Sequence, residues 1–251
     1  MTLLLDLGNT RLKAALTVPG DGVRLLGEAP HRELGMAAAL VEALAGQAPP
    51  AITAWCANVA GAGAGAELAT ALAALGGGPV EFLRGRAEAC GVRCAYPEPA
   101  RLGADRWAAL LGARGVVAAD CLVIDAGSAL TIDALRADGR HLGGWILPGL
   151  GMMVAALESR TGDLAHLRQA SAPAALAGFP TDTGPAMTGG ALLAAAGAVT
   201  RAEARLEAEA GGPARLLLTG GDAPALAAEL GRGEVVPELV LRGLARAAAA
   251  P

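Results

Sequence analysis

The stretch LLLDLGNTRLKAAL at residues 3–16 decides the fold, because it places a turn between two apolar runs. The runs lie at residues 2–7 and 11–18, and Gly8-Asn9 separates them. Two such runs around a Gly-Asn pair are typical of a β-hairpin. We therefore predict two paired strands at the start of the chain.

The polar residues around this turn exceed what a chain reversal needs. Asp6 ends the first apolar run, and Thr10 and Lys13 follow the glycine. Lys13 is the only lysine of the chain, and the other basic side chains that stay charged at neutral pH are arginines. A turn that only reverses two strands requires none of these three side chains, so we expect a binding role for the hairpin.

The pattern returns in CLVIDAGSALTIDAL at residues 121–135. Asp125 is equivalent to Asp6, because each ends an apolar run and has a glycine two residues later. A repeat at about half the chain length predicts two related lobes rather than a solenoid, which we place at residues 1–118 and 119–251. Strands followed by helical segments predict an α/β protein, and the hairpins predict mixed sheets flanked by helices.

The remaining apolar periodicity predicts further elements. Helices are expected at residues 33–46, 65–75, 104–118, 184–210, 223–231 and 238–249, and strands at 51–57, 79–83 and 214–219. The segment GGWILPGLGMMVAAL at residues 143–157 is expected to supply core packing and a turn.

Composition narrows the class of protein. The 251 residues are 53% hydrophobic, which is enough for a large core. The net charge of −4, the lack of a basic cluster and an aromatic content of 2% argue against a nucleic-acid partner. No apolar run reaches the ~20 residues of a membrane span, and the first residues do not resemble a signal peptide. We therefore expect a cytoplasmic protein without a membrane partner.

The four cysteines show no CxxC spacing. Cys90 and Cys94 are close enough in sequence to hold a metal ion, but the three histidines are scattered and offer no second half of a site. Free or buried thiols in a reducing cytosol are therefore expected.

Two Asp-x-Gly hairpins that face a common ligand have the chemistry of a nucleoside-triphosphate site with its cation. Glycine-rich turns let backbone N–H groups approach an anion. Hydroxyl and amide donors, a positive charge for phosphate and hard oxygen ligands for a cation come from the side chains of Asn9, Thr10, Ser128, Lys13, Asp6 and Asp125. A single hairpin of this kind is also explained as a tight turn. Two copies, with TGG at residues 219–221 after a third strand, favour the phosphate site, although the chain has no Walker A motif.

Four segments in order, DLGNTRLK, GADR, DAGSALTID and GGWILPGLGMMVAAL, resemble the signature segments of type III pantothenate kinases. The resemblance extends from residue 3 to about residue 244. It implies the fold of the acetate and sugar kinase, heat-shock-70 and actin superfamily, with two ribonuclease-H-like lobes of the actin-like ATPase type. It also implies ATP-dependent phosphorylation of pantothenate to 4′-phosphopantothenate, the first step toward coenzyme A. ATP, Mg²⁺, a monovalent cation (K⁺ or NH4⁺) and a homodimer are implied as well.

The resemblance also assigns residues. It implies that Asp105 is the general base, that Asp125 is the monovalent-cation ligand and that Asp6 is a candidate Mg²⁺ ligand. The residues implied to bind ATP are Asp6, Leu7, Gly8, Asn9, Thr10, Arg11, Leu12, Lys13 and Ser128. The residues implied to bind pantothenate are Tyr96, Gly103, Ala104, Asp105, Arg106 and Thr183.

Two departures from the family pattern concern hydroxyl groups. Ser128 stands where the family usually has threonine, and we expect the hydroxyl contact to be kept with looser packing. The segment GFPTDTGPAM carries both Thr181 and Thr183 as candidates for the substrate contact. Thr183 also fits the N-cap of the helix at 184–210, with a proline near the first helical position.

Other interpretations of the same residues stay open. The residues alone favour a helix-end aspartate at Asp105, stabilised by the first turn, over a catalytic one. A second interpretation is a kinase of the same fold that acts on another small hydroxyl compound. A third is an inactive relative with a regulatory role, similar to the Bvg accessory factor branch of the family. The string Gly61-x-Gly63-x-x-Ala66 after a strand fits a dinucleotide-binding fingerprint, but a chain so rich in alanine and glycine produces such strings by chance.

Overall fold

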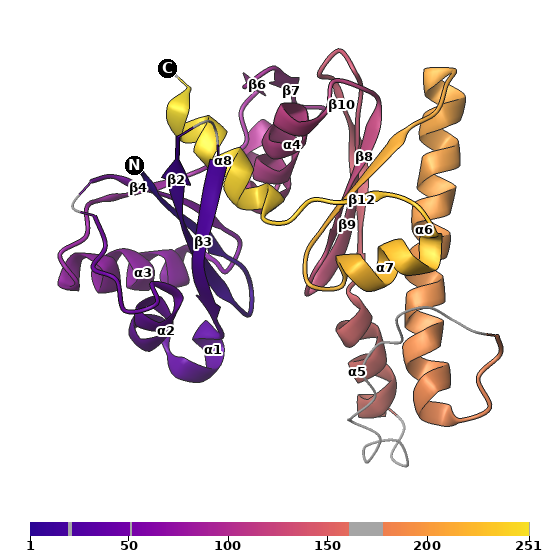
Figure 1. Ribbon diagram of the computed structural model, residues 1–251, viewed down its shortest axis with the longest axis horizontal. Coiled ribbons are helices and arrows are strands. Elements are labelled where there is room, and N and C mark those ends of the chain that lie inside the picture. The colour runs from indigo at the N-terminus through magenta and orange to yellow at the C-terminus, as the bar shows by residue number, and fades with distance from the viewer. Residues whose placement is uncertain (20–21, 51, 161–177, 251) are drawn as a thin grey trace. The chain divides into compact units, whose positions relative to one another are not determined.

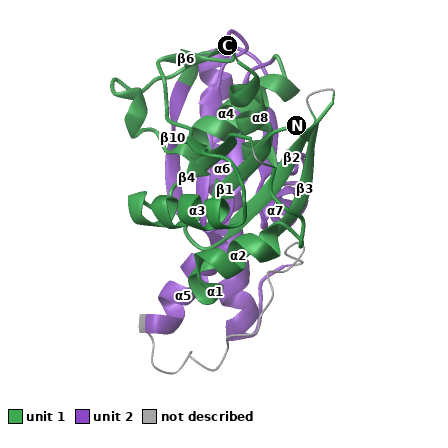
Figure 2. Ribbon diagram, turned by 90° about the vertical axis from the view of Figure 1, so that its left-hand side faces the viewer, with its two compact units in different colours: residues 1–118, 139–141, 238–251 green, residues 119–138, 142–237 purple. Residues whose placement is uncertain are grey.

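Two five-stranded sheets, each with its own helices, form the framework of the computed structural model (Figure 1). The structure describes residues 1–19, 22–50, 52–160 and 178–250. The first unit comprises residues 1–118, 139–141 and 238–251, and the second comprises 119–138 and 142–237 (Figure 2). The second unit therefore ends at Pro237, and the last helix of the chain belongs with the first unit.

The first sheet contains five strands in the order β3-β2-β1-β4-β5. Their bounds are β1 Leu3–Leu7, β2 Leu12–Val18, β3 Gly22–Ala29, β4 Ala54–Asn58 and β5 Val80–Phe82. The β1–β2 and β2–β3 pairs are antiparallel, while β1–β4 and β4–β5 are parallel. The predicted first hairpin is therefore present in a mixed sheet.

The second sheet repeats this plan with the order β10-β9-β8-β11-β12. Its strands are β8 Cys121–Ala126, β9 Ala129–Leu135, β10 His141–Pro148, β11 Arg215–Thr219 and β12 Glu234–Val235. The β8–β9 pair is antiparallel, and β11 is parallel to both β8 and β12. The predicted fold class, two lobes with mixed sheets flanked by helices, is confirmed.

The repeat carries over to the two aspartates. Asp6 lies opposite Lys13 in the first hairpin, and Asp125 lies opposite Thr131 in the second. Residues directly opposite each other in an antiparallel pair project on the same face of the sheet. Asp6 therefore has a lysine side chain beside it, whereas Asp125 has the hydroxyl group of Thr131 at the equivalent position.

Leucines of β1 and β2 form the core on one face of the first sheet together with α2 and α3. The helices of this unit are α1 His31–Leu34, α2 Met36–Ala43, α3 Ala62–Ala74, α4 Ala104–Val116 and α8 Leu239–Ala249. The single helix predicted at residues 33–46 was wrong. Gly35 has φ +79°, outside the helical region, and divides the segment into α1 and α2.

Helices α4 and α8 lie side by side because glycines face backbone at their crossing (Figure 1). A Cβ atom at Gly243 would lie 1.7 Å from the carbonyl oxygen of Ala108, and one at Gly112 would lie 2.3 Å from that of Leu239. Two glycines thus allow a closer helix approach than any other residue permits.

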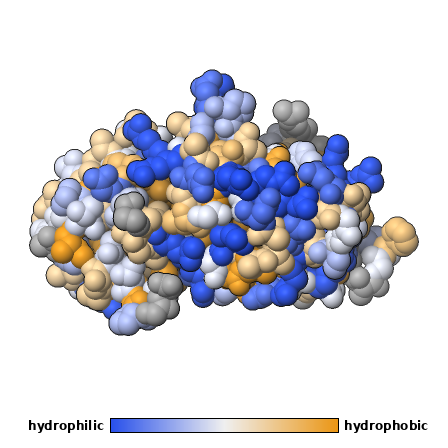
Figure 3. All heavy atoms as spheres, turned by 90° about the horizontal axis from the view of Figure 1, so that it is seen from above, coloured by the Kyte–Doolittle hydropathy of each residue, from blue (hydrophilic) through white to orange (hydrophobic). Residues whose placement is uncertain are grey.

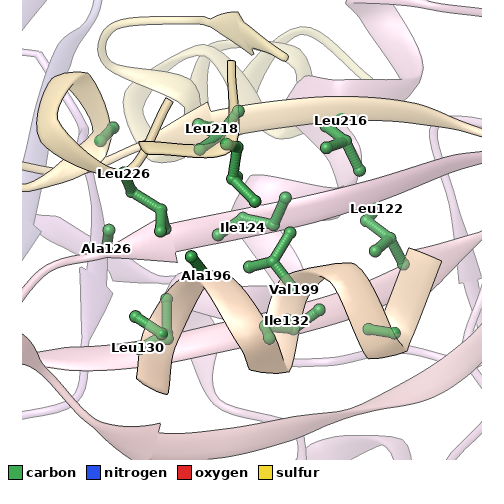
Figure 4. Close-up of a cluster of buried hydrophobic side chains, with 14 of the residues drawn as sticks. Leu122, Ile124, Ala126, Leu130, Ile132, Ala196, Val199, Leu216, Leu218 and Leu226 are labelled. Atoms are coloured by element: carbon green, nitrogen blue, oxygen red, sulfur yellow. The ribbon is translucent and has the colours of Figure 1, made fainter. Parts of the chain in front are cut away.

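The core of the second unit lies between its sheet and the helices α6 Thr183–Ala210 and α7 Ala223–Leu230. Figure 4 shows Ala196 and Val199 of α6 lying against Ile124 of β8 and Ile132 of β9. The segment at residues 143–157, for which only packing and a turn were expected, contains most of β10 and helix α5 Leu150–Arg160.

On the face drawn in Figure 3, hydrophilic side chains cover the middle and apolar ones lie in small separate areas. Among the helices that the structure describes, none is both long and apolar enough to cross a bilayer.

Candidate active site

The loop between β1 and β2 comprises residues 8–11, two more than the predicted Gly8-Asn9 turn. Leu7 pairs with Leu12, and the Gly8 N–H donates to the Arg11 carbonyl at 3.0 Å. A two-residue type I′ turn requires positive φ at both positions, and neither Gly8 nor Asn9 has it. The wider loop leaves Asn9, Thr10 and Arg11 exposed, as a phosphate-binding loop requires.

Two of the residues that the sequence analysis assigned to ATP, Leu7 and Leu12, flank this loop and have only main chain to offer a ligand. Leu7 and Leu12 are fully buried in the core of the first unit. His31, at the start of α1, lies with its Nε2 atom 2.9 Å from the Gly8 carbonyl oxygen. The imidazole therefore fixes the loop at its first residue, a contact that links positions 23 residues apart.

Lys13 lies among carboxylates on the other face of the first sheet. It pairs across strands with Asp6 and with Glu28. Its Nζ atom lies 3.9 Å from Glu28 Oε2 and 3.6 Å from Glu238 Oε2, and Arg11 makes a 3.0 Å ion pair with Glu28. Electrostatic attraction rather than hydrogen bonding holds the ammonium group, because both of its N–O distances to the carboxylates exceed hydrogen-bond length.

Glu238 is an unusual residue in two further ways. It has φ +59° at the position preceding α8, where a side chain is strained. Its Oε2 atom is buried and has no hydrogen-bond partner. Backbone strain and buried polar atoms without a hydrogen bond are both found most often at functional positions.

The GADR segment begins helix α4. Gly103 precedes the helix, and Asp105 lies in its first turn. The Asp105 Oδ1 atom accepts a hydrogen bond from the Arg106 N–H at 2.7 Å. A Cβ at Gly103 would lie 2.7 Å from that oxygen, so glycine leaves the carboxylate room. The first turn of a helix stabilises a carboxylate in its charged form.

Arg106 and Tyr96 are brought together from a helix and a loop. The Arg106 guanidinium is almost fully buried, and its Nη1 donates to the Tyr96 hydroxyl at 3.0 Å. Its Cζ atom lies 5.9 Å from the centroid of the Tyr96 ring. Together with Asp105 these residues bring a carboxylate, a guanidinium and an aromatic ring together in the first unit.

In the second unit, the tip of the second hairpin meets two glycines. The Gly149 N–H donates to the Ser128 carbonyl at 3.2 Å. Gly220 has φ +93°, and a Cβ there would lie 2.6 Å from Asp125 Oδ1 and 2.4 Å from the Ala126 carbonyl oxygen. A carboxylate and a carbonyl oxygen therefore border the space that a side chain at residue 220 would fill.

That donor set fits a hard cation. Monovalent and divalent hard cations take carboxylate and carbonyl oxygens, which is what Asp125 and Ala126 offer beside Gly220. Asp6 offers a carboxylate at the end of β1. No cluster of three or more protein ligands occurs in the described part of the chain. A single carboxylate at Asp6 fits Mg²⁺, because this ion is often held by one or two carboxylates plus substrate phosphates.

Asp222 follows the TGG turn and precedes α7. Its N–H donates to the Ala126 carbonyl at 2.9 Å, and partial burial raises the pKa of its carboxyl group. The turn after β11 is thereby tied to the end of β8, next to Asp125.

Thr183 lies in the second unit as the first residue of α6 and is exposed. The interpretation of Thr183 as N-cap was wrong, because Asp182 occupies that position and accepts from the Gly184 N–H at 3.1 Å. Thr181 is also exposed and lies just before the helix. Capping therefore does not account for either threonine.

Comparison with known proteins identifies the family of the chain. The family profile described as type III pantothenate kinase matches residues 2–205. The chain belongs to this family. A type III pantothenate kinase from Aromatoleum aromaticum is 41% identical over 246 residues, covering 98% of this chain and 96% of that protein. One from Chromobacterium violaceum is 41% identical over 254 residues, with 99% of each chain covered.

Solved structures confirm the fold of this type III pantothenate kinase family member. A Sinorhizobium meliloti protein named for 2-dehydro-3-deoxygalactonokinase has a TM-score of 0.58 and 18% identity, over 99% of this chain and 98% of that one. A Baf family protein from Campylobacter jejuni has a TM-score of 0.54 and 22% identity, over 96% and 94% of the two chains. At such identities the likeness is one of fold, the actin-like ATPase and sugar kinase fold.

Several residues around the site had no role in the sequence analysis, among them His31, Glu238 and His141. Each acts through a contact with a residue far away along the chain. Of these three residues, Glu238 alone has a positive φ, and no pattern in the sequence predicts that backbone conformation. The string at Gly61 forms the start of α3, with Gly61 at φ +99°.

Proposed function

We propose that this chain phosphorylates pantothenate with ATP through Asp105 as general base, with the Gly8–Arg11 loop and Lys13 on the phosphates and Arg106 on the pantothenate carboxylate. Membership of the family makes it a phosphotransferase of coenzyme A biosynthesis. The observation that carries the residue roles is the Asp105–Arg106–Tyr96 group at the start of α4, held together by the Arg106–Tyr96 hydrogen bond.

Asp105 takes the proton in this proposal. The primary hydroxyl oxygen of pantothenate attacks the γ-phosphorus of ATP, and its proton passes to the Asp105 carboxylate. The bond from the γ-phosphorus to the bridging oxygen breaks, and ADP leaves with the electron pair. A general base must lie within hydrogen-bond reach of this hydroxyl, and positioning with electrostatic stabilisation supplies most of the rate in phosphoryl transfer.

The phosphates are held by main-chain and side-chain donors. We assign the backbone N–H groups of residues 9–11, the side chains of Asn9 and Thr10, and the ammonium of Lys13 to the phosphates. Leu7 and Leu12 support the loop from the core. Ser128 supplies a hydroxyl from the second hairpin.

Pantothenate is bound through both its ends. Arg106 offers a guanidinium for the carboxylate, and Tyr96, Gly103 and Ala104 line the site beside Asp105. Thr183 contributes a hydroxyl, with Thr181 as the alternative.

The cations have separate positions. We assign a divalent ion to the nucleotide phosphates with Asp6 as its protein ligand, and a monovalent ion, K⁺ or NH4⁺, to Asp125. When bound, these ions neutralise charge on the phosphates. The requirement for a monovalent ion is part of the proposal.

The proposed assembly is a cytoplasmic homodimer with no membrane or nucleic-acid partner. The inactive-relative alternative is disfavoured because Asp6, Lys13, Asp105 and Asp125 are all in place.

A coupled assay that follows ADP release tests the proposal. The rate is measured with and without pantothenate and with and without K⁺, on the wild type, Asp105→Asn and the control Glu67→Gln, an exposed residue of α3. We expect pantothenate-dependent turnover that requires K⁺, persists in Glu67→Gln and falls at least about 100-fold in Asp105→Asn. Turnover retained in Asp105→Asn would exclude this base, and turnover with a different hydroxyl compound alone would change the substrate.

A further inference from the structure

Residues 139–141 belong to the first unit although they connect two strands of the second sheet. The hairpin of β6 Glu88–Ala89 and β7 Val92–Arg93 holds them there. The Arg93 N–H donates to the Gly139 carbonyl at 2.9 Å. Gly139 has φ +86°, and a Cβ there would lie 2.1 Å from the Gly91 carbonyl oxygen. Backbone contacts that only glycine permits therefore fix this connection against the first unit.

The connection ends at His141, whose side chain is buried against Tyr96. The two ring centroids are 6.2 Å apart and the planes differ by 15°, a stacked arrangement. His141 is 3% exposed. Its Nδ1 atom accepts a hydrogen bond from the Ala95 N–H at 3.5 Å, which places the proton of a neutral ring on Nε2. The ring is thus oriented both by the backbone preceding Tyr96 and by the Tyr96 ring itself.

Tyr96 is consequently fixed at two places. The Arg106 Nη1 atom donates to its hydroxyl at 3.0 Å, and His141 stacks on its ring. The loop that carries Tyr96 has no regular secondary structure from Cys94 to Pro97. The stacking contact and the hydrogen bond therefore restrict the Tyr96 side chain, which no regular backbone structure holds in place.

We propose that His141 is a positioning residue for pantothenate, which sets the plane of the Tyr96 ring and, through the Tyr96 hydroxyl, the guanidinium of Arg106. This inference rests on the proposed function, because it assumes that Tyr96 and Arg106 bind pantothenate. His141 acts through Tyr96 and takes no part in the chemistry. A stacked aromatic pair contributes about 0.5–1.5 kcal/mol beyond area burial, which corresponds to about 2- to 12-fold in a binding constant.

Kinetics of three variants separate the ring stack from the hydrogen bond. His141→Phe keeps an aromatic ring, His141→Gln keeps an acceptor for the Ala95 N–H, and His141→Leu keeps neither. We expect the KM for pantothenate to rise about 3- to 10-fold in the Leu and Gln variants and to stay within about twofold of wild type in the Phe variant. The kcat and the KM for ATP should change less than about twofold in all three. A Phe variant as impaired as the Leu variant would overturn the role of the stack.

The single tyrosine of the chain provides a spectroscopic measurement. Protein labelled with 3-fluorotyrosine has one ¹⁹F resonance, which reports Tyr96 alone. We expect pantothenate to shift this resonance in the wild type, and His141→Leu to displace it in the free protein because the neighbouring ring is lost. An unchanged ¹⁹F resonance in His141→Leu would contradict the stacking role even if that variant were less stable.

Tyr96→Leu separates failure of this inference from failure of the proposed site. An unchanged KM for pantothenate in Tyr96→Leu would mean that Tyr96 is not in the pantothenate site, and the proposed site and this inference would both fall. A raised KM in Tyr96→Leu with wild-type values in His141→Leu and His141→Gln would overturn only the inference about His141.

Discussion

The Nζ atom of Lys13 lies 3.6 Å from Oε2 of Glu238, at the start of the last helix. The oxygen is buried and accepts no hydrogen bond, so its charge is little screened. Lys13 is the charge that we assign to the nucleotide phosphates. Glu238 thus competes with ATP for the only lysine of the chain.

Glu238→Gln should therefore bind ATP more tightly. Removal of the carboxylate charge leaves more of the ammonium field for the phosphates, and we expect the KM for ATP to fall about 2- to 5-fold. Glu28→Gln should have a smaller effect, because Glu28 is 3.9 Å from Lys13 and its side chain is 41% exposed. Steady-state kinetics with ATP varied at saturating pantothenate checks both, and a raised KM in Glu238→Gln would show that Glu238 orients Lys13 instead.

Ser128 is predicted to act through its hydroxyl group alone. Ser128→Ala should raise the KM for ATP about tenfold, the size of one hydrogen bond to a charged group. Ser128→Thr keeps a hydroxyl group at this position, so its KM should stay within about threefold of wild type. Equal values for Ser128→Ala and wild type would remove Ser128 from the nucleotide site.

The crossing of α4 and α8 should not tolerate a methyl group. In Gly243→Ala the new Cβ would lie 1.7 Å from the Ala108 carbonyl oxygen, so the helices must separate. We expect a loss of at least about 2 kcal/mol in the free energy of unfolding, measured in urea. Gly63→Ala in α3 is the control, since nothing lies within 4 Å of its Cβ position, and it should change stability by less than about 1 kcal/mol. Equal stability of the two variants would mean that the crossing adjusts.

Thiol reactivity should follow burial. Cys56 and Cys121 are buried, and Cys90 and Cys94 are partly exposed. Burial, and secondarily the Asp6 carboxylate, raise the pKa of the Cys56 thiol far above its ordinary value of 9.0. An aromatic disulfide reagent should label Cys90 and Cys94 rapidly in the native protein and all four in denaturant. Rapid native labelling of Cys56, located by peptide mapping, would contradict this.

The same thiol makes stability depend on alkaline pH. Above pH 9.0 the unfolded chain loses the Cys56 proton while the folded chain keeps it. The unfolded state then binds fewer protons, so the free energy of unfolding falls as pH rises, by at most about 1.4 kcal/mol per pH unit. Cys56→Ala should show a shallower decline than wild type above pH 9 in urea titrations. Parallel declines would assign the effect to other groups.

The elements that local patterns describe were predictable from the sequence. Both hairpins follow from apolar runs around Asp6-x-Gly8 and Asp125-x-Gly127, and α6 follows from an uninterrupted alanine-rich segment with a glycine after it. β3 and β10 were missed. Both lie at sheet edges and are only partly buried, so their apolar pattern is weak.

Long-range contacts were not predictable. His141 reaches Ala95 across 46 positions, and no residue pattern in between marks the contact. Likewise, the break at Gly35 depends on a backbone conformation that glycine permits but does not require. The residues of the proposed site come from motifs in the sequence, whereas the side chains that contact them come from the geometry alone.

The membership of α8 in the first unit has a consequence for the order of biosynthesis. The strands of the first sheet leave the ribosome first, but the helix that covers them beside α4 is made after every strand of the second sheet. While the second unit is translated, α4 is therefore available to cover this face of the first sheet but α8 is not. The second unit, whose residues are contiguous except for 139–141, has all of its elements once Pro237 has emerged. The part of the chain that is synthesised first is thus the last to be completed.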